Sequence, residues 1–242
     1  MTPADSTPEK SSVEEIRQRF DADVERFSNL DTGQSAAIDA PLVLELISRA
    51  AAAVSSGPIR LLDVGCGAGN YTLKLLGRIP LAEVTLIDLS RPMLERAQER
   101  IGRETSAVIR AIQGDIREIP LEVDHYDVIV AAAVLHHLRT DNQWRSVFAK
   151  LHACLRPGGT LWIADLVDHS LAPVQELMWQ RYGEYLASLD GPEYRDRVLA
   201  YVEREDSPRS LGFQLDLLRA VGFRAVEVLH KNSVFAAFGA IK

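Results

Sequence analysis

Three glycines that could hold a ligand against the backbone stand at alternate positions within Leu61–Asn70, where an apolar run ends. Gly65, Gly67 and Gly69 lack a Cβ atom, so this turn can adopt positive φ angles and let a bulky molecule lie directly on its amide groups. The apolar run reads as a strand, and Tyr71 to Leu76 read as the start of a helix. A turn between a strand and a helix exposes free N–H groups at the position where α/β sheets hold cofactors.

The spacing of these glycines distinguishes between two known types of glycine-rich, cofactor-binding turn. A dinucleotide-binding G-x-G-x-x-G turn requires glycine at position 70, and Asn70 stands there. The G-x-G-x-G form, with Asp63 two residues ahead of the first glycine, resembles motif I of class I S-adenosylmethionine-dependent methyltransferases. The resemblance implies that S-adenosyl-L-methionine is the cofactor, that its methionine part lies over the glycine turn, and that the acid ending the next strand, Asp88, receives its ribose hydroxyls. One ionised carboxylate can accept both hydroxyls of a vicinal diol.

A second acidic turn, Gly114-Asp115-Ile116, follows the third predicted strand and resembles the adenine-edge motif of the same family. Asp115 can accept a hydrogen bond from an amino group and Ile116 can pack on a ring face, although an Asp that only caps the turn is the alternative. Asp63 can hold turn amides or face the cofactor ammonium. The resemblance implies the following cofactor residues: Asp63, Gly65, Cys66, Gly67, Gly69, Asn70, Asp88, Leu89, Met93, Gly114, Asp115, Ile116 and Ala131. For Asn70, helix capping is an ordinary alternative use.

Two adjacent histidines, His136 and His137, close the fourth predicted strand, where the resembled family places the substrate. Either could act as a catalytic base, but adjacent side chains seldom point the same way, so we expect at most one to face the pocket. A hydrogen-bonded histidine beneath the following helix is the alternative. No metal site is predicted, because neither histidine has a Cys or carboxylate at ligand spacing in the sequence. Asp165 and His169, near the end of the fifth strand, are similarly ambiguous.

The amino-acid composition of the chain limits which classes of partner it can bind. The chain has 242 residues, 47% hydrophobic content and a formal net charge of −7, which does not favour non-specific adhesion to nucleic acid or membranes. The two cysteines, Cys66 and Cys154, form no ligand cluster and indicate a reducing compartment. Since neither a membrane span nor a signal sequence is recognisable, we expect a cytoplasmic protein.

The beginning of the chain is predicted to be a disordered tail over residues 1–12, followed by a helical segment over 13–56. Val13 to Phe27 read as one amphipathic helix, which either packs on the edge of the core or forms a lid over the cofactor. A polar loop over Asn29 to Asp39 and a helix over Pro41 to Val54 are predicted next.

Strand and helix patterns alternate regularly from Ile59, so the sequence predicts a parallel sheet with right-handed crossovers. The predicted strands cover Ile59–Val64, Val84–Asp88, Ala107–Ile112, Tyr126–Ala133 and Thr160–Asp165, with a closing hairpin of Ala225–Leu229 and Ser233–Ala240. The resemblance implies an α/β, Rossmann-like methyltransferase fold over residues 57–242. It has a mostly parallel seven-stranded sheet with an antiparallel last strand, helices on both faces, and a helical insertion after strand 5.

The insertion, residues 166–208, is predicted to hold two helices, Pro173–Leu189 and Pro192–Glu205. It emerges at the carboxyl edge of the sheet and can therefore wall the substrate pocket. Its aromatic residues either do so or pack the helices together. They are Trp179, Tyr182, Tyr185, Tyr194 and Tyr201.

Three functions compete. The leading one is methyl transfer from S-adenosyl-L-methionine to a small molecule, since the chain is acidic and the insertion aromatic. The second follows from a loose similarity, over Leu229–Lys242 and around Arg195 and Arg197, to enzymes of tRNA wobble-uridine oxyacetic acid formation, which use or make a carboxylated cofactor. There an arginine pairs with the extra carboxylate, whereas a solvated helix face is the simpler reading of both arginines. The third is a non-catalytic subunit that only binds the cofactor.

Overall fold

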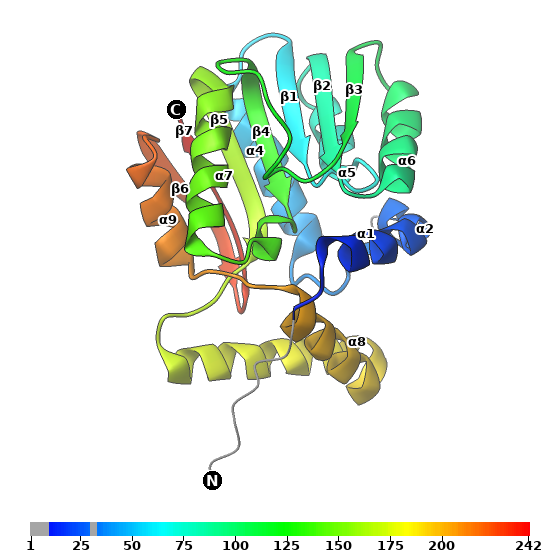
Figure 1. Ribbon diagram of the computed structural model, residues 1–242, viewed down its shortest axis with the longest axis vertical. Coiled ribbons are helices and arrows are strands. Elements are labelled where there is room, and N and C mark those ends of the chain that lie inside the picture. The colour runs from blue at the N-terminus through cyan, green and yellow to red at the C-terminus, as the bar shows by residue number, and fades with distance from the viewer. Residues whose placement is uncertain (1–9, 30–32) are drawn as a thin grey trace.

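The computed structural model describes residues 10–29 and 33–242, and their strands form one seven-stranded sheet in the order β3-β2-β1-β4-β5-β7-β6 (Figure 1). Strands β3, β2, β1, β4 and β5 run parallel, and β7 is antiparallel to both β5 and β6. The predicted mostly parallel sheet with an antiparallel last strand is confirmed. The strands are β1 Ile59–Val64, β2 Leu81–Asp88, β3 Val108–Gln113, β4 Tyr126–Ala132, β5 Leu155–Leu166, β6 Ala225–Asn232 and β7 Phe235–Ile241.

Helices cover both faces of the sheet, as predicted. Helices α7 and α9 pack on one face, and α4, α5 and α6 on the other. The helices are α1 Val13–Ala22, α2 Val24–Ser28, α4 Ala40–Val54, α5 Asn70–Leu76, α6 Arg91–Gly102, α7 Asp141–Cys154, α8 Ala172–Glu205 and α9 Leu211–Ala220, with a 3₁₀ turn, η1, at Leu135–His137.

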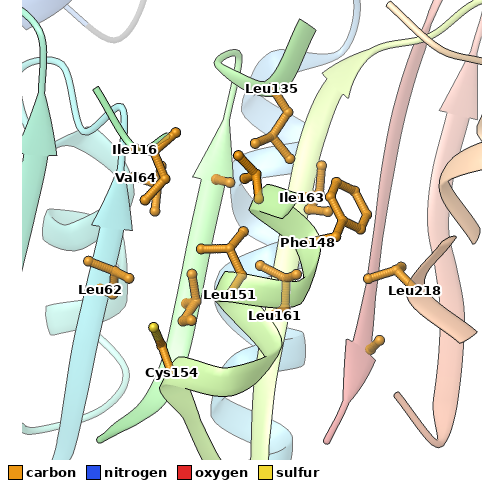
Figure 2. Close-up of a cluster of buried hydrophobic side chains, with 14 of the residues drawn as sticks. Leu62, Val64, Ile116, Leu135, Phe148, Leu151, Cys154, Leu161, Ile163 and Leu218 are labelled. Atoms are coloured by element: carbon orange, nitrogen blue, oxygen red, sulfur yellow. The ribbon is translucent and has the colours of Figure 1, made fainter. Parts of the chain in front are cut away.

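The two-residue period of the strands divides the core between these faces. On β1, Leu62 faces the α7 side and Leu61 faces the α5 side, and both are fully buried. Figure 2 shows Phe148 and Leu151 of α7 pointing onto Leu161 and other strand side chains. This packing makes the sheet a rigid platform, and its carboxyl edge is where the loops converge.

Local signals place several helix ends as expected. Ser90 caps α6 by accepting the Met93 N–H, and Thr140 with Gln143 forms the predicted capping box of α7. The insertion contains two helices, because Asp190 and Gly191 have non-helical backbone angles inside α8.

Three sequence predictions need correction. The amphipathic stretch from Val13 to Phe27 is broken at Asp23, whose φ of −105° and ψ of 11° separate α1 from α2. Strand β5 starts at Leu155, five residues earlier than predicted, because Gly158 and Gly159 pair with the backbone of Lys242. The predicted disordered tail falls mostly on residues 1–9, outside the described residues, but Ser11 is anchored by its N–H donating to the Arg204 carbonyl at 3.1 Å.

Candidate functional site

A cavity of about 560 Å³ lies at the carboxyl edge of the sheet, lined by the strand ends and by residues of α1, α2 and α8. Figure 1 shows these three helices beside that edge. The walls of the cavity come from segments far apart in sequence: the glycine turn, the ends of β2, β3, β4 and β5, and the insertion. This is the edge at which doubly wound α/β folds bind ligands.

The glycine turn forms part of the cavity wall, and its three glycines have different roles. Gly65 has a φ of 65°, and a Cβ there would lie 2.6 Å from Val134 Cγ2, so glycine allows close packing with the loop after β4. Gly67 has a φ of 49°, and a Cβ there would meet no described atom within 4 Å, since it would enter the cavity. Gly69 packs against α6 and, among the described residues, is not part of the cavity wall. Two of the three glycines therefore face the space where a ligand fits.

Asp88 ends β2 beside this turn. Its carboxylate accepts the Gly67 N–H at 2.8 Å and the Ser90 N–H at 2.8 Å, which ties the turn to the start of α6. Burial raises the pKa of Asp88 to about 6, although these amide donors oppose the rise. A carboxylate has about four acceptor positions. Asp88 therefore keeps acceptor capacity toward the cavity that it lines.

Asp63 lies in β1 under the turn and accepts the hydroxyl of Thr72 at 2.7 Å. It therefore braces α5, whereas the turn amide of Gly67 is held by Asp88. Burial raises the pKa of Asp63 to about 6. Because Asp63 also lines the cavity, the predicted alternative of facing a ligand ammonium remains a prediction.

The third-strand turn also reaches the cavity through Gly114, Asp115 and Ile116, together with Leu89 and Met93 beyond β2. The Asp115 carboxylate accepts the backbone N–H of Arg117 at 2.8 Å and its guanidinium Nε–H at 2.9 Å. The turn-capping role is thus present, and the hydrogen bond to a cofactor amino group remains a prediction. Ile116 is 7% exposed and offers an apolar wall.

His136 and His137 lie in η1, just after β4, where Ala133 has a left-handed φ of 52°. Both histidines line the cavity, so the expectation that at most one would face it is wrong. The reason is the 3₁₀ turn, which brings the ring centroids to 4.3 Å from each other. His136 Nδ1 is hydrogen-bonded to the buried carboxylate of Asp165, which also accepts the Leu135 N–H at 2.8 Å.

A second carboxylate approaches the histidines from the end of the insertion. Asp206 Oδ1 lies 3.5 Å from His136 Nε2 and 3.3 Å from His137 Nδ1. Burial opposes a charge on His136, but Asp206 and Asp165 outweigh it and raise its pKa to about 9. Burial and the neighbouring charge of His136 lower the pKa of His137. The sequence argument against carboxylates near the histidines therefore fails in three dimensions, because the fold supplies two.

Helix α1 closes over the same region. The Arg19 guanidinium pairs with the buried Glu205 at 3.0 Å and stacks 4.2 Å from the Tyr201 ring centroid. Phe20 and Phe27 add aromatic walls from α1 and α2. Neither Asp206 nor Arg19 was found by sequence reasoning, because both lie outside the strand-end motifs. That this segment moves as a lid remains a prediction.

All five aromatic residues of the insertion pack in the small core that joins α8 to the sheet. Three of them, Tyr182, Tyr194 and Tyr201, also line the cavity. Both alternatives raised by the sequence are therefore realised, and the same three residues serve both.

Several sequence candidates are placed away from the cavity, within the part of the chain that the structure describes. Ala131 is fully buried in the core of β4, and the cavity wall there is made by the following residues, Ala132 to Val134. His169 is bound by Gln175 and Lys231. Arg195 pairs with Asp196 on the exposed side of α8, and Arg197 is also exposed, so neither lines the cavity.

Two candidates line the cavity but have structural roles. Asn70 donates to the Phe27 carbonyl at 2.9 Å and accepts from Arg100 at 2.8 Å, which joins α2, α5 and α6. Cys66 is buried, and burial raises the pKa of its thiol well above the usual range. A thiol of this kind is a poor nucleophile.

Comparison with known proteins agrees with this geometry. Residues 61–159 match the family described as a methyltransferase domain. A carboxy-S-adenosyl-L-methionine synthase of Chromohalobacter salexigens is 31% identical over 189 residues, covering 74% of this chain and 67% of that protein. The chain belongs to the S-adenosylmethionine-dependent methyltransferase family. S-Adenosylmethionine is the cofactor of this family.

Two further relatives set the scope of the comparison. An uncharacterised methyltransferase of Mycobacterium tuberculosis is 38% identical over 120 residues, which covers 50% of this chain and 57% of that relative. The chain thus spans little more than half of the length of that protein. A solved Haemonchus contortus phosphoethanolamine N-methyltransferase 2 in complex with S-adenosyl-L-methionine has 18% identity and a TM-score of 0.61, covering 92% of this chain and 60% of that one. At that identity the likeness concerns the fold.

Among residues 10–29 and 33–242, no helix combines the length and apolar character that crossing a bilayer requires.

Proposed function

We propose that the protein transfers a methyl group from S-adenosyl-L-methionine to a small-molecule acceptor. The observation that carries this proposal is a cavity lined both by the glycine turn and by the histidines with the aromatic insertion, which we take as the acceptor end. A cofactor at the turn and an acceptor beside the histidines would meet inside this one cavity. Alignment of two reactants in this way supplies a large part of the rate in a displacement reaction.

The residues present at the turn fit the cofactor. The open space over Gly67 leaves room for a ligand on the backbone, Asp88 keeps free acceptor capacity, and Ile116 offers an apolar surface for a ring. When bound, the cofactor supplies a methyl group on a positively charged sulfur. Two buried acids beside the turn, Asp63 and Asp88, favour a ligand that carries positive charge and hydroxyl donors.

The acceptor end supports a small molecule. Its wall combines phenol rings from the insertion with apolar side chains such as Val198 and Phe235, and the whole cavity has a volume typical of small-ligand sites. The net charge of −7 also argues against a broad nucleic-acid surface. We propose that His136 and His137 are the catalytic groups that face the acceptor. We propose further that α1 and α2 act as a lid excluding water from it.

A second candidate is a wobble-uridine enzyme with a carboxylated cofactor, in which case tRNA is a possible partner. It is favoured by the 31% identity to the Chromohalobacter salexigens synthase. Arg195 and Arg197 do not line the cavity, so these two residues are poor candidates to pair with an extra carboxylate on the cofactor. The lysine and arginine side chains that do line the cavity, and could take that task, are Lys10, Arg19, Arg26, Arg117 and Arg139. Mass spectrometry of the ligand retained on purification distinguishes the two cofactors by the mass of the extra carboxylate.

The test of the leading proposal starts with calorimetry using S-adenosylhomocysteine, the demethylated product. Gly67→Ala should weaken binding at least tenfold, because the new methyl group enters the cavity. Gly57→Ala is the matched control, since Gly57 has a φ of 74° and equally open surroundings in an exposed loop before β1. Both substitutions bring similar backbone strain, and only the first touches the cavity.

Labelled cofactor incubated with a metabolite extract and, separately, with tRNA then identifies the acceptor. Label on metabolites supports the leading proposal and label on tRNA supports the second. Cofactor binding without any transfer in either mixture supports a non-catalytic subunit. No binding of product or cofactor by folded protein contradicts all three.

We also propose a cytoplasmic location. Both cysteines are free and buried, as expected in a reducing compartment. Fractionation of cells that express the full chain, with antibody detection, tests this location.

A further inference from the structure

The cluster formed by His136, His137 and Asp206 brings three potential metal ligands together in the cavity wall. Each residue offers one ligand atom, and the three atoms lie within 4.8 Å of one another. Asp206 Oδ1 is buried and makes no side-chain hydrogen bond within normal distance to any residue that the structure describes. A buried carboxylate oxygen without a donor is costly, so a cation must stand beside it, either a protonated His136 or a bound metal ion.

Two of the three separations match those around a small metal ion. Two ligand atoms bound at about 2.0–2.2 Å to a tetrahedral ion stand about 3.3–3.6 Å apart. Asp206 Oδ1 lies 3.5 Å from His136 Nε2 and 3.3 Å from His137 Nδ1. Hydrogen bonds between such groups are shorter, at about 2.7–3.2 Å.

One of the two histidines is held in the way that metal-bound imidazoles are held. Asp165 binds Nδ1 of His136, which leaves Nε2 directed toward Asp206, and a carboxylate on the far nitrogen is the usual support of a metal-bound imidazole. The Ser207 N–H donates to the His136 carbonyl at 2.7 Å, so the Asp206 loop is tied to η1. The third acid nearby, Glu205, is already paired with Arg19.

We propose that His136, His137 and Asp206 bind one divalent transition-metal ion, with Zn²⁺ as the best match to two imidazoles and one carboxylate. Three protein ligands leave a fourth position, which is the pattern of catalytic rather than structural zinc sites. All three residues line the cavity, so we place that position at its acceptor end. The proposal that the ion binds does not depend on the proposed function. The further step, in which an oxygen or nitrogen of the acceptor binds to the ion, rests on the proposed function.

The direct test is metal binding by the full chain. Protein stripped with a chelator is titrated with Zn²⁺ against a chromophoric competitor, and separately with Co²⁺, whose visible absorption reports four-coordinate geometry. One ion per chain and an intense cobalt band are expected. Folded wild-type protein that binds no ion, or shows no cobalt band, overturns the proposal and leaves a protonated histidine as the cation in the cluster.

Variants then assign the ligands. Asp206→Asn and His137→Ala should each weaken zinc binding at least a hundredfold, and Asp165→Asn should weaken it about 10- to 100-fold through the orientation of His136. His169→Ala is the matched control, because His169 lies outside the cluster. This variant should bind zinc as tightly as the wild-type protein does. Circular dichroism checks that each variant is folded, and His136→Gln serves as a second ligand variant if His137→Ala unfolds. Equal zinc affinity in wild type and in a folded ligand variant contradicts the assignment.

Failure of this proposal is distinguishable from failure of the proposed function. Zinc binding with no calorimetric signal from S-adenosylhomocysteine leaves the metal site in place and removes the methyltransferase proposal. A calorimetric signal from S-adenosylhomocysteine without zinc binding contradicts only the proposed metal site and leaves the methyltransferase proposal in place.

Discussion

The pH dependence of cofactor binding should be governed by Asp88. This acid is buried beside the glycine turn, and burial raises its pKa to about 6 in the free protein. Only the ionised carboxylate can accept both hydroxyls of a ribose diol while it holds the amides of Gly67 and Ser90. Lowering the pH through 6 should therefore weaken the binding of S-adenosylhomocysteine.

The size of the effect follows from the fraction of Asp88 that is ionised. With a pKa of about 6, roughly one molecule in eleven carries the charge at pH 5, so the Kd should rise about tenfold, or about 1.4 kcal/mol. Above pH 7 the Kd should change little. Binding near pH 6 should release a proton, because the ligand selects the ionised form.

The raised pKa of Asp88 affects the stability of the unliganded protein in the opposite direction: the fold is more stable at low pH, where ligand binding is weaker. An acid whose folded pKa is raised stabilises the fold below its unfolded pKa, and that contribution is lost as the pH rises through about 6. The ligand-binding form of Asp88 is thus the less stable form of the free protein.

Isothermal titration calorimetry from pH 5 to 8, in two buffers of different ionisation enthalpy, measures both the Kd and the proton release. Asp88→Asn should bind more weakly and lose the greater part of the pH slope. Asp63→Asn removes the other acid with a pKa near 6 and should keep most of the slope, because the Asp63 carboxylate already accepts the Thr72 hydroxyl. A wild-type Kd that is equal at pH 5 and pH 8, with the fold intact by circular dichroism, would refute the reasoning. So would an undiminished slope in Asp88→Asn.

Three stability predictions concern close packing, each measured by urea denaturation. Gly65→Ala should lower the free energy of unfolding by about 1–3 kcal/mol, because the new Cβ would lie 2.6 Å from Val134 Cγ2. Adding Val134→Ala should restore part of this loss. If the double variant recovers no stability, the loss comes from the backbone angle and not from the contact with Val134. Gly239→Ala on β7 should cost at least as much, because its Cβ would lie 2.2 Å from Trp162 Cε3, and an unchanged midpoint would contradict this contact. Phe148→Ala should cost about 3–5 kcal/mol at an unchanged m-value, because the ring is fully buried between α7 and the sheet (Figure 2), and a loss below 1 kcal/mol would contradict that burial.

The sequence alone was sufficient for features that depend on neighbouring residues. The glycine spacing predicted the turn, because positive φ angles are accessible to glycine without a Cβ clash. The alternation of apolar runs with capped helices predicted the parallel sheet, and Ser90 and Thr140 marked helix starts because a side-chain oxygen can reach a nearby amide. Asp88 was predicted at the cofactor site because the family resemblance places an acid at the end of the second strand, and the sequence has one there.

Features that depend on distant residues escaped the sequence. Ala131 and Ala132 are adjacent alanines, and only the packed strand shows that the first is in the core and the second lines the cavity. The break at Asp23 is likewise invisible in an apolar pattern that continues through it.

The sequence by itself determined where the chain turns and which acids end its strands, because these properties depend on backbone angles and side chains a few positions apart. Tertiary structure alone decided that Asp206, 70 residues beyond His136, returns to the two histidines. That approach depends on how α8 packs across the sheet edge, and packing energies between remote segments leave no local pattern. The acceptor end of the cavity, and with it the proposed metal site, is for this reason a product of the fold.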